Sequence, residues 1–122
     1  MFQNAFEELG DISAGIISTS YTFVPCGITS PLVLHNKSGT SAYWFSMQVV
    51  NANEPVAKLE VSTDGGATWQ GTSRAEYNFF ENQSGFGTSS VDVRVTSTSG
   101  KTLTIKDVTV ASDSQVTVSS NF

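Results

Sequence analysis

The sequence is poor in the residue types that build covalent, metal-bound or charge-driven sites. Its 122 residues include one cysteine, Cys26, and one histidine, His35, so the chain itself offers no disulfide and no usual set of metal ligands. Only 14% of the residues are charged, and the six Lys and Arg residues are scattered. With no basic stripe and no long apolar run, the sequence argues against nucleic-acid binding and against membrane insertion. No cofactor or metal is expected.

What is abundant points to β-structure. Thirty-two residues are Ser or Thr, and the apolar residues favour Val, Ile, Phe and Trp, which is typical of antiparallel sheet. A chain of this length forms one domain with a core that needs no staple. The net charge is -5, but residues 27–122 carry eight acidic and six basic side chains, a net of -2. A neutral partner therefore fits better than a polyanion.

The sequence also bears on where the protein works. Two sequons, at Asn36 and Asn82, are compatible with a secreted glycoprotein. The first residues lack the basic and apolar regions of a signal peptide. We expect a secreted, extracellular protein whose signal peptide is not part of this chain.

The stretch from Ser41 to Val50 is the clearest strand. Its odd positions from residue 43 to 49 are apolar, and this period of two places them on a core-facing side. Trp44 then falls on the opposite face, together with Ser46 and Gln48. An indole on a polar sheet face suggests a binding surface, whereas a neighbouring loop that covers Trp44 is the alternative.

The first 26 residues differ from the rest. Asn4 and Glu7 resemble a capping box for one short helix, and alternation from Ile17 to Phe23 predicts a strand. A helix and a strand are too small to fold alone, so residues 1–26 look like the end of another domain. We expect the strand from Ile16 to Val24 to lie against the remaining domain or to exchange with another copy, giving a dimer.

From Ile28 onward the pattern predicts an immunoglobulin-like sandwich of two antiparallel sheets. Short strands recur at near-regular spacing, about seven or eight of them in some 95 residues. A change of phase between Ile105 and Val108 predicts a bulge near Lys106 and Asp107. The expected strands cover residues 32–36, 43–50 and 57–62, a return strand from residue 69, a short strand within residues 72–88, and residues 91–95, 103–110 and 116–118.

No catalytic constellation is evident. A catalytic site with a nucleophile and a general base would have to combine His35 with Cys26 or a serine, and no motif supports such a pair. A histidine at a strand end that bonds to backbone or water is the simpler interpretation. Asp64 lies in a predicted turn, whereas Glu60 and Asp92 fall on polar strand faces, where they should be ionised and solvated. We predict a protein that is not an enzyme.

The stretch Ser62-Thr-Asp-Gly-Gly-Ala-Thr-Trp69 matches the Asp box of sialidases and other propellers. One copy cannot build a propeller. Physically the stretch predicts a hairpin in which the Asp64 side chain bonds to turn amides and Trp69 packs on the strands. We assign Trp69 to structure.

Three passages together resemble the second domain of the expansins, in particular the fungal expansin-like swollenins and their bacterial relatives. They are Tyr43-Trp-Phe-Ser-Met-Gln-Val-Val-Asn51, Pro55-Val-Ala-Lys-Leu-Glu60 with the Asp box, and Tyr77-Asn-Phe-Phe80 leading to Val91-Asp-Val-Arg-Val-Thr96. In that family this domain attaches to cellulose without cutting it, and group-2 grass pollen allergens are similar to it. Residues 1–26, through Gly15-Ile-Ile and Val24-Pro-Cys26, resemble the end of the family's first domain, a double-psi barrel. The resemblance thus divides the chain into a remnant, 1–26, and a carbohydrate-binding sandwich, 27–122.

The resemblance also implies which residues bind. The family's flat row of three aromatics falls here on Tyr43, Trp44 and Tyr77, and an assisting lysine falls on Lys37. Alternation alone turns Tyr43 inward, so the strand must begin irregularly at Ser41 and Ala42 to expose it. The implied partners are cellulose and other β-glucan or xyloglucan wall polymers. A sandwich for protein recognition, or an allergen-like domain without glucan binding, is the alternative hypothesis.

Overall fold

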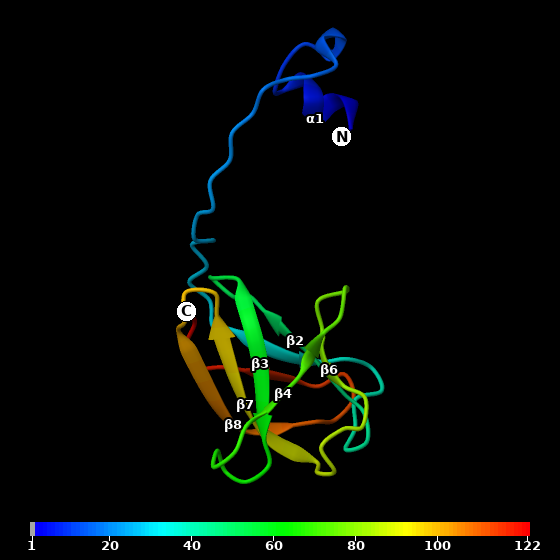
Figure 1. The fold of residues 1–122 in the computed structure, drawn as a ribbon, viewed down its shortest axis with the longest axis vertical. Helices are drawn as coiled ribbons and strands as arrows, with labels where there is room; N and C mark the ends of the chain where they lie inside the picture. Colours follow the sequence, from blue (N-terminus) through cyan, green and yellow to red (C-terminus); the bar gives the residue numbers. More distant parts are fainter. Residues whose placement is uncertain (1) are drawn as a thin grey trace.

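The computed structural model describes residues 2–122, which form a β-sandwich (27–122) preceded by an N-terminal arm (2–26) (Figure 1). The described strands form a five-stranded sheet in the order β5-β6-β2-β1-β9 and a four-stranded sheet in the order β4-β3-β7-β8. All pairings are antiparallel, which confirms the predicted fold class. The strands are β1 (Val33–Asn36), β2 (Phe45–Val50), β3 (Val56–Ser62), β4 (Gln70–Gly71), β5 (Ser73–Arg74), β6 (Phe80–Asn82), β7 (Ser90–Ser97), β8 (Thr102–Thr109) and β9 (Gln115–Thr117).

The core lies between the two sheets and follows the predicted alternation. Phe45 and Met47 of β2 are fully buried, as are Val93 and Val95 of β7. Apolar side chains that point to the same face of a pleated strand leave water together, and this burial holds the two sheets face to face. The remaining core residues are Leu32, Leu34, Val49, Val56, Leu59, Val61, Phe80, Val91, Val108, Val110 and Val118.

The predicted bulge in β8 is confirmed. Val91 pairs with Val108, but Val93 pairs with Ile105, so β8 has one more residue than β7 in this interval. Asp107 takes a left-handed conformation, with φ of 52°. The carboxylate of Asp92 stabilises the bulge, because it accepts hydrogen bonds from the Asp107 amide at 3.1 Å and from Lys106 Nζ at 2.7 Å. The bulge thereby returns Val108 to the core.

A second irregularity interrupts the alternation of β3. The register shifts between Val56 and Lys58, and Ala57 between them is exposed. Regular alternation over the expected strand 57–62 turns Ala57 to the same side as Leu59 and Val61, but only Leu59 and Val61 are buried, so alternation is wrong for Ala57. An extra residue reverses the direction of the side chains that precede it, and nothing in the sequence Val56-Ala-Lys58 signals this.

The Asp box forms the predicted turn between β3 and β4. Asp64 accepts hydrogen bonds from the Thr68 amide at 2.9 Å, the Thr68 hydroxyl at 2.6 Å and the Ser62 hydroxyl at 2.7 Å. These bonds, the Thr68 hydroxyl first, hold the pKa of the Asp64 carboxyl far below its usual range. Trp69 is half-buried, and the Arg94 guanidinium lies 4.4 Å from its ring centroid. Both residues stabilise the hairpin.

The N-terminal arm differs from its prediction. Helix α1 (Gln3–Glu7) begins after Phe2 with no side-chain cap, so Asn4 is not the capping residue. Residues 16–24 are extended, and all but Ile17 are exposed, but they form no strand, and in Figure 1 the arm leads away from the sandwich. An extended segment needs a partner strand for its amides and carbonyls. Only the base of the arm touches the sandwich, where the Cys26 amide donates to Asn53 O at 3.3 Å.

Candidate functional site

The N-terminal end of β2 presents the first two candidate residues. Regular pairing in β2 begins at Phe45, and a tight turn precedes it, in which the Ser41 amide donates to Trp44 O at 2.8 Å. The Tyr43 amide donates to the Ser41 hydroxyl at 3.2 Å. Tyr43 thus lies outside the strand alternation, and 80% of it is exposed. The irregular start is confirmed, and the inward direction predicted from alternation was wrong.

The loop after β6 supports this turn from behind. The Gly87 amide donates to Ala42 O at 2.7 Å. Gly85 has φ of +64°, and a Cβ placed on it would lie 2.1 Å from Ala42 O. No side chain fits in that gap, so the position of the Tyr43 turn depends on a glycine at residue 85.

Lys37, Trp44 and Tyr77 come together on the outer face of the five-stranded sheet. Lys37 follows β1, and its amide donates to Ser46 O at 3.0 Å. Its ammonium nitrogen lies 5.4 Å from the ring centroid of Trp44 and 5.1 Å from that of Tyr77. Such cation–π contacts hold a lysine between two rings. Tyr43 precedes Trp44 in sequence and is exposed.

Trp44 fits neither sequence interpretation alone. It is half-buried, and a Cβ on Gly39 would lie 4.0 Å from Trp44 Cζ3, so the turn after β1 borders the indole. Tyr77 is 54% exposed and Tyr43 is 80% exposed. The face therefore offers two open phenol rings and one partly covered indole.

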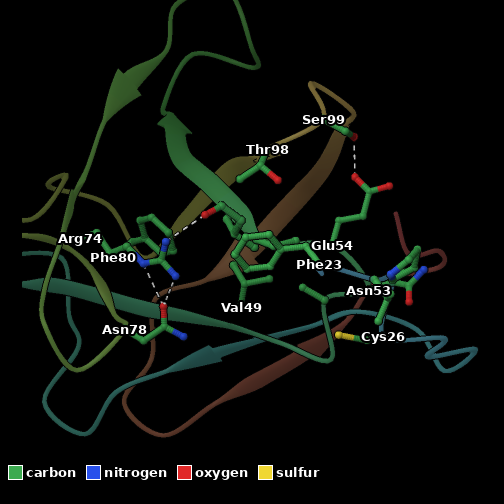
Figure 2. A pocket seen from close by; sticks show the side chains of 15 residues that line it. Phe23, Cys26, Val49, Asn53, Glu54, Arg74, Asn78, Phe80, Thr98 and Ser99 are labelled. Atoms are coloured by element: carbon green, nitrogen blue, oxygen red, sulfur yellow. Dashed lines mark hydrogen bonds between the residues drawn. The ribbon is translucent and has the colours of Figure 1, made fainter. Parts of the chain in front are cut away.

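The segment between β5 and β6 carries Tyr77, and hydrogen bonds fix its backbone. The Ala75 amide donates to Phe79 O at 2.8 Å, and Asn78 has φ of 64°. Arg74 donates from Nε and Nη2 to Asn78 Oδ1 at 3.0 and 2.6 Å, and from Nη1 to Val56 O at 2.9 Å (Figure 2). Arg74 thus ties this segment to the other sheet. The sequence predicts only a short strand within residues 72–88 and gives no sign of this contact.

Glu81 connects Tyr77 to the centre of the sheet. β6 pairs with β2 so that Glu81 lies opposite Ser46. Its Oε1 accepts from the Tyr77 hydroxyl at 2.5 Å and from the Ser46 hydroxyl at 3.0 Å. The hydrogen bond to Glu81 raises the pKa of the Tyr77 phenol above its ordinary value. Sequence reasoning missed Glu81, because only the register of β2 and β6 places it beside Tyr77.

The aromatic contacts continue past Tyr77 but lose their common orientation. The rings of Tyr77 and Phe79 are 5.8 Å apart and tilted by 50°, and those of Phe79 and His35 are 6.4 Å apart at 63°. His35 Nδ1 lies 3.2 Å from Gln115 Nε2, so this histidine has a structural side-chain partner rather than the predicted backbone or water. A flat ligand that lies on Tyr77 does not also lie flat on Phe79.

A separate groove lies where the arm joins the sandwich. Its volume is about 910 Å³, and its walls include Val49, Val56 and Phe80, with Phe23 and Cys26 from the base of the arm (Figure 2). Cys26 is thus in this groove, whereas His35 contacts Phe79 and Gln115 on the sheet face. His35 and Cys26, the pair that no sequence motif supports, lie in different parts of the molecule.

The structure also bears on two other classes of site. Within residues 2–122, no group of three or more His, Cys, Asp or Glu side chains is arranged to hold a metal ion. None of the described helices has the length and apolar character needed to cross a membrane.

Comparison of the sequence with known proteins finds curated relatives of one kind. The chain is 35% identical over 98 residues to Expansin-YoaJ of Bacillus subtilis, covering 80% of this chain and 41% of the relative. It is 29% identical over 119 residues to Expansin-like protein 1 of Dictyostelium discoideum, covering 97% of this chain and 41% of the relative. The chain therefore spans less than half the length of these relatives. No protein-family model matches the sequence.

Solved structures give the same result for the fold. The expansin of Clavibacter michiganensis superposes with a TM-score of 0.77 at 27% identity, over 96% of this chain and 57% of that one. A variant of that expansin, solved in complex with cellohexaose, gives a TM-score of 0.69 at 24% identity, over the same shares of the two chains. These likenesses extend over the sandwich and most of the arm.

Proposed function

We propose, from the likeness of this chain to expansins and expansin-like proteins, that its sandwich binds cellulose and related β-1,4-glucans without cutting them. The binding residues are Tyr43, Trp44, Tyr77 and Lys37. One observation carries the proposal: the Lys37 ammonium lies against both Trp44 and Tyr77 on an open sheet face. The fold thus brings together Lys37 and Tyr77, which are 40 positions apart in sequence.

The mechanism is stacking of sugar rings on aromatic rings. The faces of glucose units in a β-1,4-glucan present C–H groups, which the open rings of Tyr43 and Tyr77 remove from water. The Lys37 ammonium keeps hydrogen atoms free to bond to sugar hydroxyls, because its contacts with the two rings are not hydrogen bonds. A neutral polymer suits this face, which carries few charges.

The expected affinity is modest. At about 25 cal/mol per Å² and about 60–80 Å² per ring, three fully covered rings contribute about 5 kcal/mol, and the partial cover of Trp44 lowers this sum. Association offsets much of it. Binding to short soluble oligosaccharides should therefore be weak, about micromolar or weaker, and binding to fibrous surfaces that present many sites should be useful. Salt should have little effect, because the gain is apolar.

The relatives support the ligand class. A variant of the Clavibacter michiganensis expansin has been solved in complex with cellohexaose, a β-1,4-glucan oligomer. We place this chain with the wall-binding modules of extracellular, wall-loosening expansin-like proteins of the swollenin type. Within that proposal, residues 1–26 are the end of a preceding barrel domain and residues 27–122 are the binding module.

Retention on microcrystalline cellulose tests the proposal. The wild-type chain should be retained, and a Trp44→Ala, Tyr77→Ala double variant should lose most of this retention. Phe23→Ala is the matched control, because Phe23 is 89% exposed yet belongs to the arm. Thermal unfolding must show that each variant is folded. Equal retention of wild type and double variant would contradict the proposal, and a protein partner without glucan affinity would favour the alternative of protein recognition.

A further inference from the structure

We propose that Glu81 is a positioning residue for carbohydrate binding: its carboxylate holds the Tyr77 ring in the orientation that a glucan stacks on. The inference rests on the proposed function and extends it to a residue that touches no sugar. It assigns to β6 a role in the site besides its place in the sheet. Its starting point is that one carboxylate oxygen of Glu81 serves both Tyr77 and Ser46.

The pairing of β2 with β6 fixes the position of Glu81 independently of Tyr77. Ser46 lies opposite Glu81 in the β2–β6 pairing, and its side chain is fully buried. The Ser46 hydroxyl donates to Glu81 Oε1 at 3.0 Å, so a buried donor with a fixed place determines where that oxygen lies. The Tyr77 hydroxyl reaches the same oxygen at 2.5 Å. A short bond to a charged acceptor is stronger than a neutral one.

Tyr77 needs such a contact, because it is the candidate ring that stands farthest from β2 in sequence. It lies on a loop and is 54% exposed. Arg74 restrains the backbone of this loop through Asn78, but that contact leaves the Tyr77 side-chain torsions free. A ring that rotates freely must be ordered when the ligand binds, and this ordering reduces affinity. The bond to Glu81 orders the ring beforehand.

The charges around Tyr77 agree with this role. Lys37 lies 5.1 Å from the ring centroid, and the Glu81 carboxylate accepts from the ring's hydroxyl, so both charged groups act on one phenol. The hydrogen bond from Tyr77 to the carboxylate, together with the nearby negative charge, raises the pKa of the phenol.

A set of variants separates this role from simple stability. Glu81→Ala removes the acceptor, whereas Glu81→Gln keeps an oxygen that accepts from both hydroxyls. Tyr77→Phe keeps the ring and removes its anchor. Glu76→Ala is the matched control, because Glu76 is an exposed carboxylate next to Tyr77. Retention on microcrystalline cellulose is measured for each, and the titration of the Tyr77 phenol is followed by NMR without any glucan.

If Glu81 positions Tyr77, Glu81→Ala weakens retention about fivefold, which is the usual scale for one lost hydrogen bond. Glu81→Gln restores most of it, Glu76→Ala changes little, and adding Glu81→Ala to Tyr77→Phe has no further effect. The pKa of Tyr77 falls toward its ordinary value in Glu81→Ala.

Three results would overturn the inference. They are an unchanged Tyr77 pKa in Glu81→Ala, equal losses in Glu81→Gln and Glu81→Ala, and fully additive losses in the double variant. Wild-type chain that shows no retention would overturn the proposed function, and the role of Glu81 in binding with it. In that case the titration still reports whether Glu81 anchors the phenol, so the two failures are distinguishable.

Discussion

Tyr43 is the candidate residue whose identity most directly sets the contact area offered to a sugar. It is 80% exposed, and the turn that carries it is fixed by the amide of Gly87, which donates to Ala42 O. Because the backbone is held and the ring is open, a larger ring at this position gains contact with a ligand without rearranging the fold.

We therefore expect Tyr43→Trp to bind cellulose more tightly. An indole adds about 30–40 Å² of apolar contact, which corresponds to about 1 kcal/mol and about a fivefold gain. A binding isotherm on microcrystalline cellulose measures the change. Phe23→Trp, the same type of substitution on the arm, should leave the isotherm unchanged. A lower affinity of Tyr43→Trp for cellulose would show that residue 43 does not stack on the ligand.

At this scale the sequence predicted much of the site. Alternation and resemblance both point to Trp44, whereas resemblance alone points to Lys37 and Tyr77, and the structure brings these three together. For Tyr43 the alternation rule conflicted with the resemblance, because a period of two holds only while the strand is regular. Glu81 had no signal, since its contact with Tyr77 depends on the pairing of strands that the sequence does not encode locally.

At the scale of elements, the site depends on the close approach of two loops. The loop after β6 passes behind the turn before β2, and the approach is closest at Gly85. Two glycines in this loop have positive φ, Gly85 at 64° and Gly87 at 72°. Of the two, only Gly85 has backbone atoms where a Cβ would lie. Substituting each glycine therefore separates the effect of backbone strain from the effect of a steric clash.

We expect Gly85→Ala to destabilise the sandwich by more than about 2 kcal/mol, because it combines left-handed backbone strain with a collision against Ala42 O. Gly87→Ala should lower the free energy of unfolding by about 1 kcal/mol, because it introduces backbone strain without a steric clash. Urea unfolding monitored by tryptophan fluorescence measures both. If the two variants have the same midpoint, the contact with Ala42 has no energetic importance.

The elements that the sequence predicted best are those with long alternation and a large buried face. Alternation located β2, β3 and β7, and the phase change located the bulge in β8. The strands β5 and β6 were not separated, because each has only two or three residues and the segment between them is irregular. The strand expected in the arm had good alternation but no partner, so pattern alone predicted it wrongly.

At the scale of the whole molecule, the arm is the least integrated part. Several of its apolar side chains are almost entirely exposed, among them Ile16 at 91% and Tyr21 at 87%. Apolar surface of this kind marks an interaction site in a stable protein. The arm extends away from the sandwich, so a neighbouring copy can reach it (Figure 1).

We propose that the free chain forms a dimer by exchange of this arm. Removal of residues 2–22 should give a monomer with an unchanged unfolding temperature, because only the base of the arm contacts the sandwich. Light scattering at several concentrations measures the mass of both chains, and Tyr21→Ser should shift the full chain toward monomer. A full chain that is monomeric at every concentration would contradict the proposal.

The bulge in β8 has a consequence for crowded conditions. β8 is the outermost strand of its sheet, and an uninterrupted outermost strand invites main-chain pairing with a second molecule. At Lys106 and Asp107 the ladder is broken, and the lysine is tied to Asp92 and to Gly65 O. Where many copies settle side by side along a fibre, this break discourages them from polymerising into a continuous sheet, so each remains a separate adsorbed unit.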